Sequence, residues 1–263
     1  EGGGDYAGQS VANAGDVDGD GLDDLLVGAF SNDDVAATAG KVYLFYGKTL
    51  ADRTRINLAR ADYSFLGEYS YDEAGSSVAS AGDVDGDGKA DILVGARYRD
   101  FGGSNSGAVY LILSSSLEPG EDADGRVEHT MSLSEADYKF YGESSGIHVG
   151  WTVASAGDID GDDRDDIMFS AYSPAYGSGY WGRGRVHIAT AASLDGRSGW
   201  IPATSVDHII DGEAEYDRLY NAIASAGDVD GDGLDDIILG AAENDSAGLN
   251  AGMAYVLLGS SFG

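Results

Sequence analysis

Four short stretches of the sequence place aspartates at alternate positions around a glycine. Each stretch is nine residues long, and positions one, three, five and nine are always aspartate. The stretches are 16–24, 83–91, 158–166 and 228–236. Alternating carboxylates in a tight turn bring several hard oxygen atoms together, and Ca²⁺ takes six to eight oxygen ligands at about 2.3–2.6 Å. We therefore expect one calcium site in each stretch, four in all.

The expected ligands are the four aspartates of each loop and the residue at position seven, whose main-chain carbonyl can add an oxygen. They are Asp16, Asp18, Asp20, Leu22 and Asp24; Asp83, Asp85, Asp87, Lys89 and Asp91; Asp158, Asp160, Asp162, Arg164 and Asp166; and Asp228, Asp230, Asp232, Leu234 and Asp236. Without a cation these carboxylates would repel one another strongly. A polar surface turn would explain one copy more easily than four copies with one spacing.

The third loop differs from the other three at two positions. Asp163 replaces the glycine found at position six elsewhere, where we expect a left-handed backbone that glycine adopts most easily. Arg164 then adds a positive charge beside the ligands. We predict that the third site binds calcium most weakly. An EF-hand is excluded for all four loops, because position twelve is apolar and not the glutamate that this motif requires.

Composition restricts the classes of partner. The formal net charge of the 263 residues is −31, with 15 Lys and Arg against 46 Asp and Glu. Four Ca²⁺ ions, each with two positive charges, would reduce this to −23. The remaining negative charge argues against nucleic acid and against anionic membranes as partners. The chain has no cysteine and no apolar run long enough to insert into a membrane. Because weak calcium sites are useful where calcium is millimolar, we expect a secreted or cell-surface location.

Each aspartate loop belongs to a longer repeat of β-strands. The loops follow one another after 67, 75 and 70 residues. We expect a strand before each loop (10–15, 77–82, 152–157, 222–227) and a short apolar strand after it (25–29, 92–96, 167–171, 237–241). A third strand is expected at 41–46, 108–113, 185–189 and 253–258, and a weaker fourth at 55–58, 128–133 and 206–210. The loop would thus join the first strand to the second.

Four-stranded antiparallel units of this kind are the blades of a β-propeller. We therefore predict an all-β propeller of four blades in a single domain spanning residues 1–263. The approximate blade limits are 1–64, 65–139, 140–209 and 210–263, and the last blade lacks its fourth strand. Four blades can close into a ring with one short blade, or can form part of a longer array. We favour the ring, since an arc would expose sheet edges.

The repeat resembles a known family. The phrase Phe65-Leu66-Gly67-Glu68, the segment Gly75-Ser76-Ser77-Val78-Ala79, the aspartate loop and Ile92-Leu93-Val94-Gly95-Ala96 are similar to the FG-GAP repeat. This repeat is known from the propeller of integrin α subunits and from bacterial relatives. The resemblance covers almost the whole chain and implies one blade per repeat, with Ca²⁺ bound on the lower face. Integrin propellers have seven blades, whereas four repeats are present here.

The face opposite the metal loops is the expected binding surface. Its loops are rich in aromatic residues and arginine, a composition typical of interaction hot spots and of surfaces that stack on sugars. The candidate ligand residues are Tyr98, Arg99, His148, Trp151, Tyr176, Tyr180, Trp181, Arg183 and Tyr216. Packing between blades would explain about half of these aromatics equally well, because large side chains also fill propeller cores.

Two functions of different classes remain. The first is a calcium-stabilised recognition or adhesion module that binds protein or carbohydrate, with no catalytic residues. The second is a propeller enzyme, or the propeller of one, of the polysaccharide lyase or phospholipase type. His148, Tyr180 and Arg183 would be its nearest catalytic candidates, but no nucleophile motif or phosphate loop supports it. A structural spacer, self-association and further blades from a longer chain also remain open.

Overall fold

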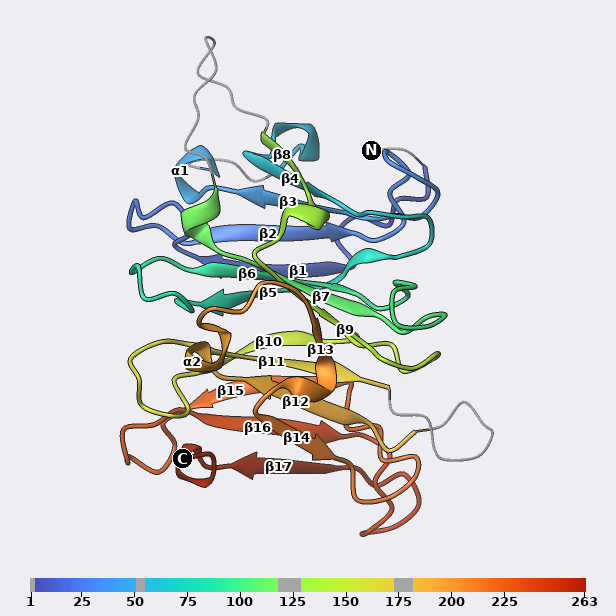
Figure 1. The fold of residues 1–263 in the computed structure, drawn as a ribbon, viewed down its shortest axis with the longest axis vertical. Helices are drawn as coiled ribbons and strands as arrows, with labels where there is room; N and C mark the ends of the chain where they lie inside the picture. The colour runs from blue at the N-terminus through green and yellow to red at the C-terminus, as the bar shows by residue number, and fades with distance from the viewer. Residues whose placement is uncertain (1–2, 51–54, 118–128, 173–181) are drawn as a thin grey trace.

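The chain is almost entirely β-structure in the computed structural model, which describes residues 3–50, 55–117, 129–172 and 182–263. Its strands form four mainly antiparallel sheets (Figure 1). In each sheet an inner strand runs into one aspartate loop, and the next strand leaves that loop and pairs with the first. The all-β prediction and the expected position of the loops are confirmed.

The strands have the following bounds. The first sheet contains β1 (Ser10–Gly15), β2 (Asp24–Ala29), β3 (Lys41–Phe45), β4 (Tyr63–Leu66) and β8 (His129–Ser132). The second contains β5 (Ala74–Gly82), β6 (Asp91–Ala96), β7 (Ala108–Ile112), β9 (Tyr138–Tyr141) and β13 (Gly199–Pro202). The third contains β10 (Val153–Gly157), β11 (Asp166–Ala171), β12 (Arg185–Ala189) and β14 (His208–Asp211). The fourth contains β15 (Ala222–Gly227), β16 (Asp236–Ala241) and β17 (Met253–Leu257).

Helical segments are short and lie between strands. Two are α-helical turns, α1 (Gly47–Leu50) and α2 (Ala191–Leu194). Five are 3-10 turns, η1 (Leu58–Arg60), η2 (Ser114–Ser116), η3 (Leu133–Glu135), η4 (Ala203–Ser205) and η5 (Gly259–Ser261). In three of the four repeats a turn of this kind directly precedes the fourth strand or the segment leading into it.

The prediction for the fourth strand was wrong in two of three repeats. The fourth strands are β4, β9 and β14, and only β14 overlaps the segment predicted for it. Residues 55–58 form no strand. The segment predicted at 128–133 is β8, which pairs in parallel with β4 of the preceding sheet as a fifth strand, just as β13 pairs with β9. Tyr63 and Phe65 are buried on β4, so the alternating pattern of a strand was present in the sequence, a few residues after the segment predicted for it. The approximate blade limits after residues 64, 139 and 209 fall inside these fourth strands.

Each inner strand contains a β-bulge just before its aspartate loop. The register of the pairing shifts between Asn13 and Gly15, and the same shift occurs two residues before the loop in the other three sheets. The glycine at this point has a left-handed backbone, with φ of +74° at Gly15 and +76° at Gly82. A bulge with glycine in this conformation bends the strand sharply. The sequence Ala-Gly-Asp therefore marks the place where the strand turns into the aspartate loop.

The core lies between neighbouring sheets. The inner strands of successive sheets pack against one another, β1 against β5, β5 against β10 and β10 against β15. Small residues such as Ala14, Ala81 and Ala156 are fully buried on these strands, whereas Phe65 and Phe140 fill the space farther out. Small residues near the axis and large residues at the periphery give each pair of sheets the wedge shape of propeller blades.

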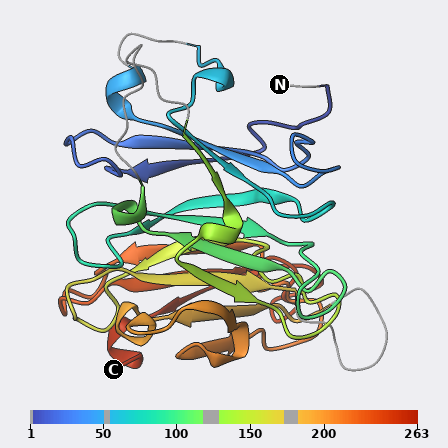
Figure 2. The same ribbon diagram turned by 45° about the horizontal axis from the view of Figure 1, so that its top comes forward.

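The four sheets form an open row and not the ring that we favoured. In Figure 1 the first sheet lies at one end of the molecule, the last sheet lies at the other end, and the second and third lie between them; Figure 2, a view turned by 45°, again shows the first sheet at one end. Among the described residues, substantial packing joins only neighbouring sheets. Within the described part of the chain, the first and last sheets each have one face that no other sheet covers.

Candidate calcium loops and the opposite loop edge

Each aspartate loop gathers three carboxylates around one point. The groups are Asp16, Asp18 and Asp24; Asp83, Asp85 and Asp91; Asp158, Asp160 and Asp166; and Asp228, Asp230 and Asp236, whose ligand atoms lie within 4.8 Å of one another in each group. These are positions one, three and nine of the predicted motif. The aspartates at position five lie outside the groups, and in the first loop Asp20 Oδ1 instead accepts the N–H of Leu22 at 2.9 Å.

The aspartate at position one organises the turn. Asp16 accepts the N–H groups of Gly19 at 2.8 Å, Asp20 at 3.0 Å and Gly21 at 2.8 Å. Equivalent bonds reach Asp83, Asp158 and Asp228 in the other loops. This carboxylate therefore fixes the loop backbone around itself, because three successive amides point at it. The carbonyls of position seven remain proposed ligands.

The aspartate at position nine is fully buried and joins the loop to the helical turn that follows the third strand. Asp24 accepts the N–H of Val17 and that of Gly47, both at 2.8 Å, and Asp91 accepts those of Val84 and Ser114 at 2.9 and 2.8 Å. Burial raises the pKa of Asp24 to about 6 and that of Asp91 to about 7, and backbone hydrogen bonds only partly offset this. A buried carboxylate of this kind favours a cation beside it.

The third loop shows an oxygen atom that lacks a hydrogen-bond partner. Asp160 Oδ1 is buried and has no hydrogen-bond partner among the described residues. Burial, followed by the charge of Asp162, raises the pKa of Asp160. Unpaired buried polar atoms are rare in folded proteins because they cost free energy. An all-oxygen set of this kind fits a hard cation such as Ca²⁺ and does not fit a metal that prefers nitrogen or sulfur.

The two sequence differences of the third loop have structural consequences. Asp163 has φ of +65°, the left-handed backbone expected there, where Gly21 and Gly88 have +86° and +87°. Arg164 forms an ion pair with Asp162 at 2.9 Å and with Asp195 at 3.2 Å. A guanidinium therefore already neutralises the carboxylate at position five. In the first loop the ammonium of Lys48 pairs instead with Asp18 at position three. In the second loop the Ser115 hydroxyl donates a hydrogen bond to Asp85 at the same position.

Position eight of each loop reaches the preceding loop, a role that the sequence did not reveal. The Asp165 N–H donates to the Asp83 carbonyl at 2.9 Å, and Asp165 Oδ2 accepts the Asp83 N–H at 2.7 Å. Asp235 and Asp158 repeat this pair at 2.8 and 3.1 Å. At the first junction Ala90 keeps only the backbone bond, to the Asp16 carbonyl. These inter-sheet links place a residue of an aspartate loop at each junction between the described sheets.

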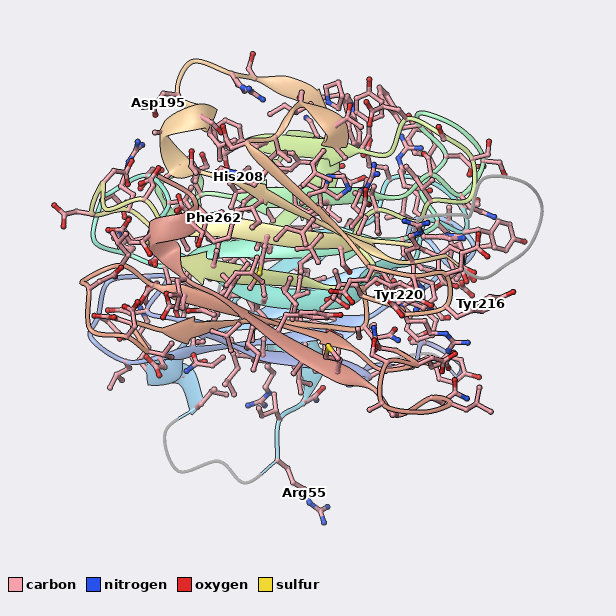
Figure 3. The ribbon with its side chains drawn as sticks, turned by 90° about the horizontal axis from the view of Figure 1, so that it is seen from below. Arg55, Asp195, His208, Tyr216, Tyr220 and Phe262 are labelled. Atoms are coloured by element: carbon pink, nitrogen blue, oxygen red, sulfur yellow. The ribbon has the colours of Figure 1, made fainter. Side chains whose placement is uncertain are left out.

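The loops at the opposite edge contain the predicted ligand residues that are described. Figure 3 shows Tyr216 and Tyr220 at one edge and Asp195 and Phe262 toward the other, and Asp195 pairs there with Arg164 of the third aspartate loop. Tyr98, Arg99, His148, Trp151, Arg183 and Tyr216 all belong to loops at the first edge. Tyr176, Tyr180 and Trp181 lie outside the described residues. Tyr216 and Arg183 are exposed, whereas Arg99 is buried.

An arginine and a group of aromatic rings connect all four sheets at this edge. Arg97 pairs with Glu73 at 2.8 Å, and its guanidinium lies 5.0 Å from the centre of the Trp151 ring. The rings of this aromatic cluster are Phe30, Tyr98, His148, Trp151, Tyr172 and Tyr220. The pKa of His148 is lowered, mainly by burial, and its Nδ1 lies 3.1 Å from the Arg97 carbonyl. Several of the predicted ligand residues therefore pack against one another.

A second group surrounds Arg99 in the interior of the same edge. Its guanidinium lies 3.3 Å from Asp72 and 4.1 Å from the centre of the Tyr69 ring. Tyr110 donates its hydroxyl to Glu68 at 2.7 Å. Burial raises the pKa of Asp72 to about 7, although Arg99 opposes this change. Trp200 of β13, which we had not singled out, stacks on Phe101 at 4.3 Å beside this group.

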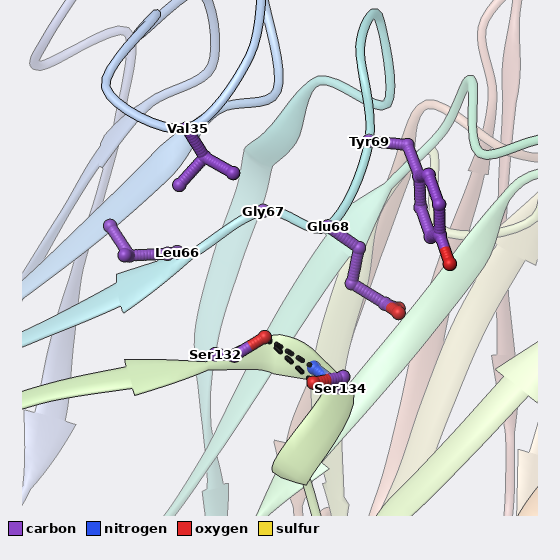
Figure 4. A pocket seen from close by; sticks show the side chains of 7 residues that line it. All are labelled: Val35, Leu66, Gly67, Glu68, Tyr69, Ser132 and Ser134. Atoms are coloured by element: carbon purple, nitrogen blue, oxygen red, sulfur yellow. Dashed lines mark hydrogen bonds between the residues drawn. The ribbon is translucent and has the colours of Figure 1, made fainter.

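Beside Glu68 lies a pocket of about 400 Å³. Figure 4 shows the side chains around it, which come from the segment between β2 and β3, from the end of β4 and the residues after it, and from the end of β8 and η3. They are Val35, Leu66, Gly67, Glu68, Tyr69, Ser132 and Ser134. The hydroxyls of Ser132 and Ser134 bond to each other at 2.7 Å. The pocket is open, and the strand crossing from the second repeat forms one of its walls.

Successive, mainly antiparallel sheets, each with an aspartate loop between its first two strands, are typical of the blades of a β-propeller. The FG-GAP repeat matches three stretches of the chain, residues 7–45, 74–112 and 220–257. Each stretch contains the inner strand, the loop, the second strand and the third strand of one sheet. The repeat around the third loop lies outside these stretches but has the same strand order.

The chain is also similar to integrin α subunits. It is 32% identical to integrin alpha-PS2 of Drosophila melanogaster over 177 residues, which are 65% of this chain and 12% of the relative. Over 199 residues it is 31% identical to integrin alpha-5 of Xenopus laevis, covering 72% and 17%. Over 248 residues it is 28% identical to integrin alpha pat-2 of Caenorhabditis elegans, covering 92% and 18%. The chain thus spans less than a fifth of these relatives. It is an FG-GAP-repeat, integrin α-like domain.

In the part of the chain that the structure describes, no helix has the length and apolar character needed to cross a membrane.

Proposed function

We propose that the chain is a calcium-binding recognition and adhesion module that binds a protein or carbohydrate ligand through its loop edge. The observation that supports this most directly is the division of the molecule into two edges. One edge repeats the same carboxylate group four times, and the other combines exposed aromatic and cationic side chains. Similarity to integrin α subunits supports a role in cell adhesion and a cell-surface or secreted location.

Calcium would have a structural role at the first edge. The aspartates at positions one, three and nine would hold it, with position five and the position-seven carbonyl adding ligands. The bound ion would supply positive charge to carboxylates that are otherwise crowded and buried. Because position nine also holds the third strand and position eight the neighbouring sheet, each ion would stabilise a whole blade and its junction. The third site would be the weakest, because Arg164 already pairs with Asp162.

Ligand contact would fall on the exposed members of the loop edge. Tyr216 and Arg183 are exposed, and Tyr69 and Tyr71 expose more than half of their surface. The aromatic cluster and the Arg99 group beneath them would hold these loops in place. Rigid loops lose little entropy on binding, which favours affinity. We propose binding rather than catalysis because His148 is packed among rings with its Nδ1 against the Arg97 carbonyl.

The test is binding of the calcium-loaded chain to arrayed glycans and arrayed extracellular proteins. The affinity for a ligand found in this way should fall at least tenfold in Arg183→Glu and in Tyr216→Ala. Ile209→Arg, on the outer strand of the third sheet, is the matched control and should bind normally. A ligand whose binding is insensitive to both loop-edge variants, but lost in the control, would refute the assignment of this edge.

A further inference from the structure

A group of aromatic rings lies at the outer part of the loop edge, where the connection from β4 to β5 meets the second sheet. We call it the aromatic platform, and its members are Tyr69, Phe101, Tyr141 and Trp200. Phe101 stacks on Trp200 with the ring centres 4.3 Å apart, and the Tyr141 ring meets Phe101 edge-on at 4.9 Å. Tyr69 is 56% exposed and Phe101 is 46% exposed. Grouped aromatic rings at the surface of a folded chain indicate a binding surface.

The repeated fold does not require these rings. β13 pairs with β9 as β8 pairs with β4, and Asp72 accepts the N–H of Tyr69 as Asp217 accepts that of its counterpart, so equivalent positions can be compared. The counterparts in other repeats are small or polar: Thr130 for Trp200, Asp34 for Phe101 and Ala214 for Tyr69. The platform is therefore a feature of one junction and not of the repeat.

The platform lies inside the row of sheets, with a described sheet on either side of the junction. Neighbouring sheets pack on one another through their first three strands. Among the described residues, the outer strands β4, β8, β9 and β13 have no substantial packing on the neighbouring sheet. The outer strands of the first two sheets therefore diverge, which leaves the rings of the platform accessible to solvent.

The pocket beside Glu68 adjoins the platform, because Tyr69 lines it as well (Figure 4). Its volume of about 400 Å³ lies within the range of about 300–1,000 Å³ that is common for small-molecule sites. Ser132 Oγ accepts the N–H of Ser134 at 3.2 Å and bonds to the Ser134 hydroxyl at 2.7 Å. Lys139 donates to the Ser134 carbonyl at 2.6 Å. These bonds fix two hydroxyl groups in the wall of the pocket.

The equivalent position between the second and third sheets is closed. There the hydroxyl and the N–H of Thr204 both donate to Glu143. Thr204 is the counterpart of Ser134, since each is the second residue of the 3-10 turn that follows the parallel fifth strand. Glu68, the counterpart of Glu143, instead accepts the hydroxyl of Tyr110 at 2.7 Å. The carboxylate that would close the pocket is thus held elsewhere, and Ser134 remains exposed.

Together the platform and the pocket match one class of ligand. The face of an aromatic ring packs on the C–H groups of a sugar, and carboxylate and hydroxyl groups bond to sugar hydroxyls. The net charge of −31 disfavours an anionic ligand. A cationic ligand is disfavoured because the Arg99 guanidinium already lies 4.1 Å from the centre of the Tyr69 ring and 6.0 Å from that of Phe101. A neutral sugar is the ligand that suits both the rings and the hydroxyls.

We propose that the aromatic platform and the pocket form a binding site for a neutral glycan. One sugar ring would occupy the pocket and bond to Glu68, Ser132 and Ser134. The next ring of the glycan would lie on Phe101. This inference rests on the proposed binding through the loop edge, and it names the class of ligand and its place there.

The experiment is saturation-transfer NMR and calorimetric titration of the calcium-loaded chain with methyl glycosides of glucose, galactose and mannose and with disaccharides of these sugars. At least one methyl glycoside should bind, and its disaccharide should bind more tightly. Val35→Trp places a large ring in the wall of the pocket and should weaken binding of the methyl glycoside about tenfold. Phe101→Ala should spare the methyl glycoside and abolish the gain of the disaccharide. Leu249→Trp makes the matched change in the loop between β16 and β17 and should bind like the wild type.

Thermal melting in calcium should match the wild type in Val35→Trp and Leu249→Trp, since both side chains are exposed. A glycan whose affinity falls in Arg183→Glu and Tyr216→Ala, but not in Val35→Trp, would overturn this inference and leave the proposed function standing. Binding of an arrayed protein through the loop edge, with no binding of any glycoside, would have the same meaning. The absence of any ligand among the glycosides and the arrays would overturn both proposals.

Discussion

The inter-sheet link of Asp165 gives a quantitative prediction. Its carboxylate accepts the Asp83 N–H at 2.7 Å across the junction between the second and third sheets. Hydrogen bonds to charged groups contribute about 1.5–3 kcal/mol. Burial raises the pKa of Asp165, which shows that the loss of water around the carboxylate offsets part of that contribution. We therefore expect Asp165→Ala to lower the free energy of unfolding by about 1–2 kcal/mol.

The assay is equilibrium urea denaturation in saturating calcium, with the slope held common between variants. The chain offers matched controls. Asp235→Ala removes the same link at the next junction and should cost a similar amount. Asp23→Ala removes the equivalent carboxylate of the first loop, which makes no link between sheets and accepts only an exposed hydrogen bond from Asn13 Nδ2 at 2.8 Å, so this variant should stay within about 0.5 kcal/mol of the wild type. Equal effects of Asp165→Ala and Asp23→Ala would refute the reasoning.

Two further predictions concern the third repeat and acid stability. Arg164→Leu introduces the residue of the first and fourth loops and removes the ion pair with Asp162. This variant should bind calcium at the third site severalfold more tightly in a calorimetric titration. The control Lys89→Leu breaks no such pair and should change the affinity of the second site less. A lack of change in Arg164→Leu would contradict the predicted weakness of this site. Burial lowers the pKa of His187 to about 4, whereas the same side chain in the unfolded chain has a pKa of about 6.5. As the pH drops from about 6.5 to 4, the unfolded chain therefore takes up a proton before the folded chain does. The free energy of unfolding should fall over this range by about 3 kcal/mol in total. Denaturation curves of His187→Phe should lack this loss, and an unchanged pH dependence would show that His187 is not its source.

The sequence predicted the local structure around the loops correctly because a short motif determines it. The Ala-Gly-Asp bulge, the aspartate turn and the apolar strand after it are all encoded within about twenty residues. The fourth strand was misplaced because β8 and β13 leave their own repeat and pair with the preceding sheet. That pairing depends on how repeats are arranged in space, which the spacing of one repeat does not contain.

The arrangement of the carboxylates was predictable to the same extent, whereas their binding of calcium stays a prediction. Positions one, three and nine come together as expected, because they lie on one turn. The roles of Asp165 and Asp235 were hidden, since position eight looks like one more acidic residue until the sheets are packed. Arg99 was predicted to face a ligand, but it is buried against Asp72 and Tyr69. The open row was also not predictable, because closure depends on the wedge angle that many side chains set together.

The most direct test of the account is calorimetric titration of calcium into chelator-stripped chain, followed by thermal unfolding with and without the ion. The account predicts four ions per chain, one of them weaker than the rest, and a large rise in melting temperature. A site filled at one hundred times its dissociation constant adds about 2.7 kcal/mol to the free energy of unfolding. No binding at millimolar calcium, or binding that leaves the melting temperature unchanged, would contradict the assignment of the aspartate loops.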